Sequence, residues 1–460
     1  MRHPLMLRGQ SEPTGGSRLT RRAGMRAAAS SASAAAVGLV AACAPGQGGG
    51  APSAATRGPV TLRYALDEIV PAGQGTYSEG RQLITAAFMA PGGPIRVEIE
   101  AVKPVYAAIL TQAAAGDPPD VTMTHPREYH PFVNAGALLE LDSYLKRDKR
   151  NVPDVVPSVL EYWTRDGHTY GLPNAHAVQA IYYNRAAFQR QGLKTPDQYE
   201  KEGTWTFETY LELSRRLTAG TADTKVWGGF WPNNTLDIQA GFLWSFGGDL
   251  WDKTLENTLL DSKESLEAIQ FQADLTARYG VSPTAEERQQ LPNGNGGTLA
   301  AERAPTEILM TTALGMLTRA PFPLGMAPMP KGRAGRVVRG APLGVQLMKG
   351  ATHHDAAWEF GNFHAGLEAE RIMLGLHLAV AWHRSSLGSA AFAKQLQPWE
   401  DAAAYTESVN TVRPTRYPGK FSEIDRIYSA AFDTVRHGQS TAAQAMAESK
   451  PQITALLRQK

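Results

Sequence analysis

Cysteine is almost absent from this sequence: Cys43 is the single cysteine among 460 residues. One cysteine cannot form an intrachain disulfide, and it excludes a cage of thiolates around a metal. A long hydrophobic run is also missing from the N-terminal region. The uncharged stretch 27–42 has 16 residues, mostly alanine and serine. It is shorter and less apolar than the roughly 20 residues that a membrane-spanning helix needs.

An excess of charge of either sign is absent as well. The formal net charge is +2, with 43% hydrophobic and 20% charged residues, a composition typical of globular proteins. Beyond the N-terminal region no basic stripe marks a nucleic-acid surface, so we expect no nucleic acid as a partner.

Catalytic motifs are missing too. The sequence has no Gly-x-Ser-x-Gly or His-Glu-x-x-His pattern, and the glycine cluster at 293–297 lacks the Lys-Ser/Thr of a phosphate-binding loop. Asp67 and Glu68 cannot serve as a glycosidase pair, because sequence neighbours usually point apart. We therefore expect no enzyme, no cofactor and no metal. A secreted carbohydrate-active enzyme is kept as an alternative.

What is present begins at the N-terminus. Basic residues between Arg18 and Arg26 precede the uncharged stretch, which ends in Val40-Ala41-Ala42-Cys43. This layout is typical of an export signal, and its end resembles the lipobox of bacterial lipoproteins, in which the cysteine takes the lipid. We expect a signal peptide over 1–42 and lipidation of Cys43. Lipid chains would then anchor the protein to the outer face of the cell membrane, extracellular or periplasmic.

The export route stays open between the general secretory pathway and the twin-arginine pathway, which Arg21-Arg22 resembles. Residues 43–58, rich in glycine, alanine and proline, predict a flexible tether of roughly 20 Å. Removal of 42 of the 460 residues leaves 418, enough for two domains.

The folded part starts with an α/β pattern. Alternating residues at 60–66 and 95–99 predict strands, helical spacing at 78–88 and 106–115 predicts helices, and 120–123 predicts a buried strand. Such an order favours a mostly parallel sheet, in which ligands bind beyond the carboxyl ends of the strands. The polar segment 124–129 follows one of these strands, and we expect a pocket loop there.

Further motifs resemble those of extracellular solute-binding protein family 1, the carbohydrate-type receptors of ABC importers. One is Ala115-Gly116-Asp117-Pro118-Pro119-Asp120-Val121. The others lie at 135–142, 170–173, 182–184, 204–207, 246–249, 327–330 and 355–360. Together they cover nearly the whole folded region in the family's order.

The resemblance implies a periplasmic-binding-protein-like fold of two α/β lobes with a hinge and an interlobe ligand cleft. The lobes would comprise 59–173 plus 328–380 and 174–327 plus 381–460. The chain would cross between them after Pro173, near 327–330 and near 378–383, and the lobes would close over the ligand. The implied partners are a small-molecule solute, an ABC permease and an ATPase.

Sugars offer hydroxyl edges and C–H faces, so their pockets need aromatic plates and polar groups that bind hydroxyls. Trp231 and Asn233 share one segment, Trp244 precedes a Gly-Gly turn, and Trp382 lies at the third expected crossing. Alternatively, each tryptophan ring packs in the hydrophobic core and contacts no ligand.

Polar candidates follow the strands and crossings. Asp67 and Glu68 follow the first strand, His125 and Arg127 follow the strand at 120–123, and Asn174 and His176 lie beyond Pro173. Arg416 and Tyr417 belong to a proline-bounded loop that the family often turns toward the ligand, and Arg413 is equally eligible to face inward. Arg127 and Arg416 favour an anionic solute such as glycerol phosphate, whereas exposed tryptophans favour a neutral sugar.

Overall fold

The computed structural model describes residues 59–73, 75–149, 154–221, 224–231, 235–292, 296–311, 317 and 320–459. Cys43, the signal segment and the tether lie outside these residues, as does Asn233. Residues Arg57–Lys460 form one compact unit. The described helices lack the combination of length and apolar character that a membrane crossing requires.

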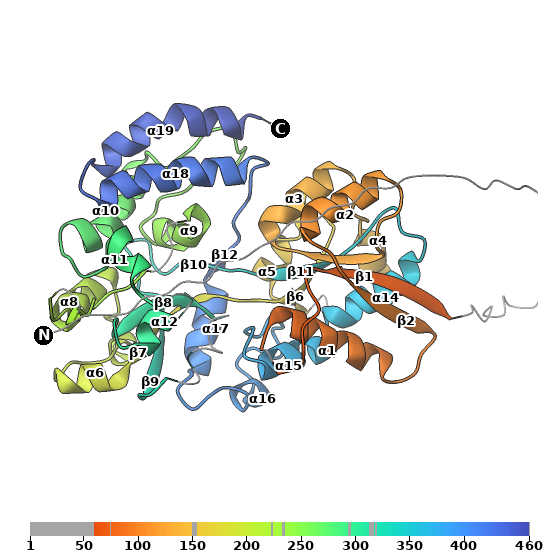
Figure 1. Cartoon of the computed structure of the whole chain (residues 1–460), viewed down its shortest axis with the longest axis horizontal. Coiled ribbons are helices and arrows are strands. Elements are labelled where there is room, and N and C mark those ends of the chain that lie inside the picture. Colours follow the sequence, from red (N-terminus) through yellow and green to blue (C-terminus); the bar gives the residue numbers. More distant parts are fainter. Residues whose placement is uncertain are drawn as a thin grey trace, which may run out of the picture. The chain divides into compact units, whose positions relative to one another are not determined.

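The larger sheet has five strands in the order β2-β1-β3-β11-β6 (Figure 1). Strands β2 and β3 run parallel to β1, and β11 lies antiparallel between β3 and β6. The sequence pattern predicts the first three strands correctly. The bounds are β1 Val60–Leu66, β2 Ile95–Ala101, β3 Val121–Thr124, β6 Leu172–Ala175 and β11 Leu343–Leu347.

Helices pack on this sheet and, with it, form what we call the N-lobe. One face carries a core of strand residues such as Leu62 and Val345, packed against Trp358 and Phe360 of α14. A short hairpin, β4 Thr164–Arg165 with β5 His168–Thr169, lies beside the sheet. The helices of the N-lobe are α1 Tyr77–Met89, α2 Val105–Ala114, α3 Pro126–Asn134, α4 Asp142–Arg147, α5 Pro157–Glu161, α14 His354–His364 and α15 Leu367–Gly375.

A second sheet of three strands has the order β8-β7-β9, with β7 antiparallel to both neighbours. All six residues of β7 are buried, which fits the apolar run that predicts this strand. We call this sheet and the helices around it the C-lobe. The strands are β7 Gln179–Asn184, β8 Thr306–Met310 and β9 Leu324–Pro328, and a separate parallel pair joins β10 Val338–Arg339 to β12 Val412–Arg413.

Several helices of the C-lobe begin at side-chain caps. Thr206 caps α8, Ser262 caps α10 and Thr441 caps α19, each by accepting a hydrogen bond from a backbone N–H of the first turn. The helices are α6 Arg185–Arg190, α7 Pro196–Lys201, α8 Phe207–Leu217, α9 Leu236–Ser245, α10 Lys263–Ala277, α11 Ala285–Gln289, α12 Gly297–Ala300, α16 Ala390–Ala393, α17 Ala402–Asn410, α18 Phe421–Arg436 and α19 Ala442–Leu457.

Three segments connect the lobes, and they are hydrogen-bonded to one another. The amide of Ala341 donates to the carbonyl of Ala177 at 2.8 Å, and the amide of Val380 donates to the carbonyl of His176 at 2.8 Å. The hydroxyl of Tyr162 donates to the carbonyl of Gly340 at 2.9 Å. The two lobes are therefore joined by a bonded set of crossings, as a hinge requires.

The strands locate these crossings relative to the expected positions. Strand β6 continues to Ala175, beyond Pro173, because Ala175 pairs with Leu343 of the central strand β11. The chain stays with the C-lobe beyond 327–330, because β10 pairs with β12. The third crossing includes Val380, inside the expected segment. The residue limits of the two lobes remain predictions.

Candidate functional site

The N-lobe contributes one wall of the candidate site from the ends of two adjacent strands. Asp67 follows β1, and His125 follows β3, which pairs with β1 through Tyr64 and Val121. Asp67 Oδ1 lies 3.2 Å from Arg81 Nη1. The charge of Asp67 favours the protonated form of His125, against the larger effects that lower the pKa of this histidine.

Helix α3 replaces the predicted pocket loop at 124–129. The loop prediction is wrong from Pro126 onward, because Pro126 occupies the first turn of the helix, where its missing N–H costs no hydrogen bond. Tyr129 and Phe132 are buried against the N-lobe, whereas Arg127 and Asn134 are exposed on the other side. The predicted residue Arg127 therefore lies on an exposed helix face.

The C-lobe contributes the other wall through residues that the sequence analysis missed or left open. Asp237 lies in the first turn of α9, and its Oδ2 is 2.7 Å from Nη2 of Arg339 on β10. Their side chains are only 5% and 12% exposed. Tyr417 is buried and hydrogen-bonds Arg339. Burial lowers the pKa of Arg339, but Asp237 and Tyr417 raise it above its ordinary value, so this guanidinium stays charged.

The two walls act on each other electrostatically. Loss of solvation together with the charges of Arg81, Arg127 and Arg339 lowers the pKa of His125 to about 4. The charges of Asp237 and Tyr417 in turn contribute to the raised pKa of Arg127. His125 itself is exposed to solvent.

Direct contact across the lobes occurs at α3. The ring of His130 lies 6.4 Å from the ring of Tyr417, measured between centroids. Burial and the charge of Arg165 lower the pKa of His130 to about 4. At neutral pH both His125 and His130 are therefore neutral imidazoles, each able to donate one hydrogen bond and accept another.

Asn174 and His176 lie beneath these walls, at the first crossing, and both are fully buried. Asn174 Nδ2 contacts Met123 Sδ at 3.3 Å, while its Oδ1 has no partner among the described residues. The two ring nitrogens of His176 likewise lack one there. Burial and the charge of Arg339 lower the pKa of His176 to about 3. His176 is therefore influenced by the C-lobe wall.

The remaining predicted residues lie elsewhere. Glu68 is half-buried, and its Oε2 lies 3.6 Å from Lys103 Nζ. Arg416 is exposed on the C-lobe, where its Nη1 donates to the carbonyl of Lys253 at 2.8 Å. Tyr417, its neighbour, is the residue of that loop that faces Arg339.

The three predicted tryptophans are buried in this conformation. Trp231 is 4% exposed and packs on Phe242 at 5.2 Å between ring centroids. Trp244 donates from Nε1 to Asp249 at 2.8 Å. Trp382 is fully buried and donates from Nε1 to the carbonyl of Ala365. Their rings thus pack in the hydrophobic core, which is the alternative interpretation given in the sequence analysis.

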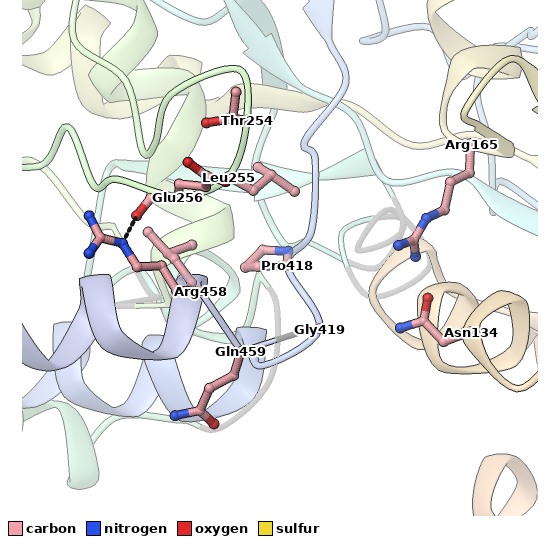
Figure 2. A pocket seen from close by; sticks show the side chains of 10 residues that line it. Asn134, Arg165, Thr254, Leu255, Glu256, Pro418, Gly419, Arg458 and Gln459 are labelled. Carbon is pink, nitrogen blue, oxygen red and sulfur yellow. Dashed lines mark hydrogen bonds between the residues drawn. The ribbon is translucent and has the colours of Figure 1, made fainter.

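A cavity of about 670 Å³ adjoins the contact between His130 and Tyr417. Figure 2 shows Asn134 and Arg165 on one side and Glu256 and Arg458 on the other. Its lining residues are Asn134, Arg165, Thr254, Leu255, Glu256, Pro418, Gly419, Leu457, Arg458 and Gln459. The cavity is therefore bordered by both lobes.

One group of side chains in the described residues has the composition of a metal site. Glu140, Asp142 and His168 place their ligand atoms within 4.8 Å of one another. His168 Nδ1 lies 3.0 Å from Glu140 Oε1 and 3.1 Å from Asp142 Oδ2, and hydrogen bonds to both carboxylates raise its pKa. Glu140 and His168 are exposed and Asp142 is half-buried, and the three side chains already form an ion-paired cluster.

Comparison with known proteins gives consistent matches. A family model described as bacterial extracellular solute-binding protein matches residues 73–370. A putative binding protein of Brucella abortus is 24% identical over 299 residues, which are 59% of this chain and 64% of that protein. The matched part thus spans less than two thirds of this relative.

Solved structures match over most of the chain. An ABC substrate-binding protein of Listeria monocytogenes in complex with cycloalternan has a TM-score of 0.72 and 19% identity, and the match covers 87% of this chain and 100% of that one. The sugar-binding protein MalE of Xanthomonas citri has a TM-score of 0.74 and 17% identity, with coverage of 86% and 97%. At these identities the likeness establishes the fold: two lobes joined by a hinge.

Proposed function

Because the chain belongs to the bacterial extracellular solute-binding protein family, we propose that it is the substrate-binding component of an ABC importer. In this proposal it captures a sugar or oligosaccharide between its lobes and delivers it unaltered to the permease, which an ATPase drives. The observation that supports the proposal is a set of polar side chains on both lobes that influence one another: the charge of Arg339 lowers the pKa of His125, and the charge of Asp237 raises the pKa of Arg127.

The charge pattern of the walls favours a neutral ligand. Each arginine of the two walls already has a carboxylate neighbour. The pairs are Arg81 with Asp67 at 3.2 Å, Arg127 with Glu128 at 2.6 Å and Arg339 with Asp237 at 2.7 Å. A phosphate would have to compete with these carboxylates, whereas a hydroxyl can accept from the guanidinium and donate to the carboxylate. The neutral imidazole of His125 adds a further donor and acceptor.

Lobe closure follows from this arrangement. A ligand that contacts both walls binds the closed form more tightly than the open form, and only that difference in affinity shifts the equilibrium. The crossings at Ala177, Ala341 and Val380 are the segments whose dihedral angles would change.

Calorimetry and product analysis test the proposal. The purified protein is titrated with mono-, di- and oligosaccharides and with glycerol 3-phosphate, and each sugar is recovered afterwards. We expect one-to-one binding of a sugar, which is recovered unchanged. Turnover of the sugar would indicate an enzyme, and binding of the phosphate ester alone would indicate an anion receptor.

We also propose that Cys43 carries the lipid that holds the protein at the outer face of the membrane, after removal of residues 1–42. The support is the sequence Val40-Ala41-Ala42-Cys43 at the end of an uncharged stretch that follows a basic segment. Expression of Cys43→Ser in the native host tests this. The variant should leave the membrane fraction and lose incorporation of labelled palmitate, and retention of both would refute the anchor.

A further inference from the structure

The cavity and the N-lobe wall of the candidate site share helix α3. Arg127, His130 and Asn134 recur at intervals of three and four residues, so they lie along one face of α3. Nine residues of helix extend over about 13 Å. Arg127 at one end belongs to the inner wall, and Asn134 at the other end lines the cavity.

The C-lobe runs alongside in the same order. Tyr417 hydrogen-bonds Arg339 in the inner wall, and the next residues, Pro418 and Gly419, line the cavity. The contact of Tyr417 with His130 stands at the junction. A ligand that extends from the inner walls along α3 therefore enters this cavity.

The lining suits the outer units of a sugar chain. Asn134 and Gln459 present exposed amides, and the half-buried Leu255 offers apolar surface to C–H faces. Arg458 donates from Nε to the carbonyl of Glu256 at 3.3 Å and from Nη2 to Asn257 Oδ1 at 3.0 Å. These are neutral acceptors, which leave the charge of Arg458 unneutralised by either contact.

The loop that holds Leu255 is ordered before any ligand arrives. Asp252 Oδ1 accepts from the amide of Glu256 and from Thr254 Oγ1, both at 3.0 Å, and its Oδ2 accepts from Asn257 Nδ2 at 2.7 Å. Leu255 has a φ of 58°, a left-handed conformation that is uncommon for a leucine. A preorganised wall reduces the entropy lost when a ligand binds.

We propose that this cavity is an outer subsite for the far end of a chain-like glycan, whose inner units lie between Arg127 and Arg339. The inference rests on the proposed function. It predicts that affinity rises with chain length until the cavity is filled, and that the residues of the cavity matter only for glycans long enough to reach it.

Titration calorimetry with two homologous series tests this: glucose to maltotetraose, and arabinose to arabinotetraose. The proteins are wild type, Asn134→Ala, Arg458→Ala and the control Arg216→Ala, which removes an exposed arginine from α8. We expect Asn134→Ala and Arg458→Ala to weaken binding of the longer members of the series that binds by about tenfold. The shortest member that binds should keep its affinity, and the control should match wild type throughout. Unchanged melting temperatures would exclude misfolding.

The possible outcomes distinguish a failure of the outer subsite from a failure of the proposed sugar-receptor function. Equal affinity for all chain lengths, or an equal loss for short and long glycans, overturns the outer subsite and leaves the sugar receptor standing. Binding of acetate or inorganic phosphate that requires Arg458 would identify an anion site and overturn it as well. If neither series binds, both the subsite and the sugar-receptor proposal are refuted.

Discussion

Arg339 Nη2 lies 2.7 Å from Asp237 Oδ2, and this pair connects β10, next to the hinge, with the first turn of α9. The two residues are 102 positions apart in the sequence. A nearly buried guanidinium with its own carboxylate gives the C-lobe wall a fixed polar surface that carries no net charge.

Breaking this pair should weaken both the fold and ligand binding. In Asp237→Asn the buried Arg339 loses its carboxylate, which we expect to cost about 3–5 kcal/mol in the free energy of unfolding. Urea unfolding measures the stability, and calorimetry measures the affinity for the sugar. Arg416→Ala is the control, because Arg416 is exposed and its removal should change stability by less than about 0.5 kcal/mol. A wild-type urea midpoint for Asp237→Asn would contradict the prediction.

Buried histidines should make the protein sensitive to acid. Burial lowers the pKa of His176 to about 3, below its ordinary value of 6.5, so the folded state holds the neutral ring. The resulting stability is complete above pH 6.5. It falls by about 1.4 kcal/mol per pH unit as the pH drops toward 3, because the unfolded chain binds the proton first.

His176→Leu removes this proton uptake. Between pH 6.5 and pH 5 the wild type should lose about 2 kcal/mol more than the variant, as measured by urea unfolding at both values. The pKa of Glu307, raised to about 7 by burial, has the opposite effect, but it is common to both proteins and cancels in the difference. Parallel pH profiles would show that His176 takes up no proton on unfolding.

Gly340 should tolerate no side chain. A Cβ there would lie 2.8 Å from His176 Cε1 and 2.9 Å from Val412 Cγ1, within the bonded crossings. We expect Gly340→Ala to cost about 1–3 kcal/mol and to alter the lobe angle. Urea unfolding and small-angle scattering with and without sugar measure these effects. Gly93→Ala, where nothing lies within 4 Å, should keep wild-type stability or gain slightly.

Glu370 should hold the third crossing in place. Its Oε2 accepts from the amides of Trp382 and His383 at 2.6 and 2.9 Å and lies 2.9 Å from His383 Nδ1. Glu370→Leu leaves these buried donors unpaired, so we expect a loss of about 3 kcal/mol or more. Hydrogen exchange should show faster exchange at 380–383 in the variant. Exchange at the wild-type rate would mean that other contacts hold this segment.

Local patterns in the sequence predict much of the fold. The strand at Val60–Leu66 and the helix at Phe207–Leu217 agree with the structure at both ends, since alternation and helical spacing reflect burial within one element. Helix α3 is the exception. The polar residues and the proline at 124–129 favour a loop, although Pro126 at the first turn is itself a helix-start signal.

The candidate site was harder to predict. Asp67, His125 and Arg127 follow adjacent parallel strands, so a rule about strand ends finds them. Arg339 and Asp237 escape such rules, because only tertiary packing joins positions 102 residues apart. Trp231 was misjudged for another reason. An aromatic side chain suits a ligand pocket and a hydrophobic core equally well, and only the fold shows that this ring is buried.

The position of β11 has a consequence for synthesis of the chain. This strand lies between β3 and β6, yet it begins only at Leu343, far beyond the ends of those strands at Thr124 and Ala175. During translation the larger sheet therefore lacks one of its inner strands. The edges of β3 and β6 that later pair with β11 stay open to mispairing. The first lobe cannot finish before residue 347 emerges. A nascent chain of this topology remains incomplete, and thus accessible to chaperones, through most of translation.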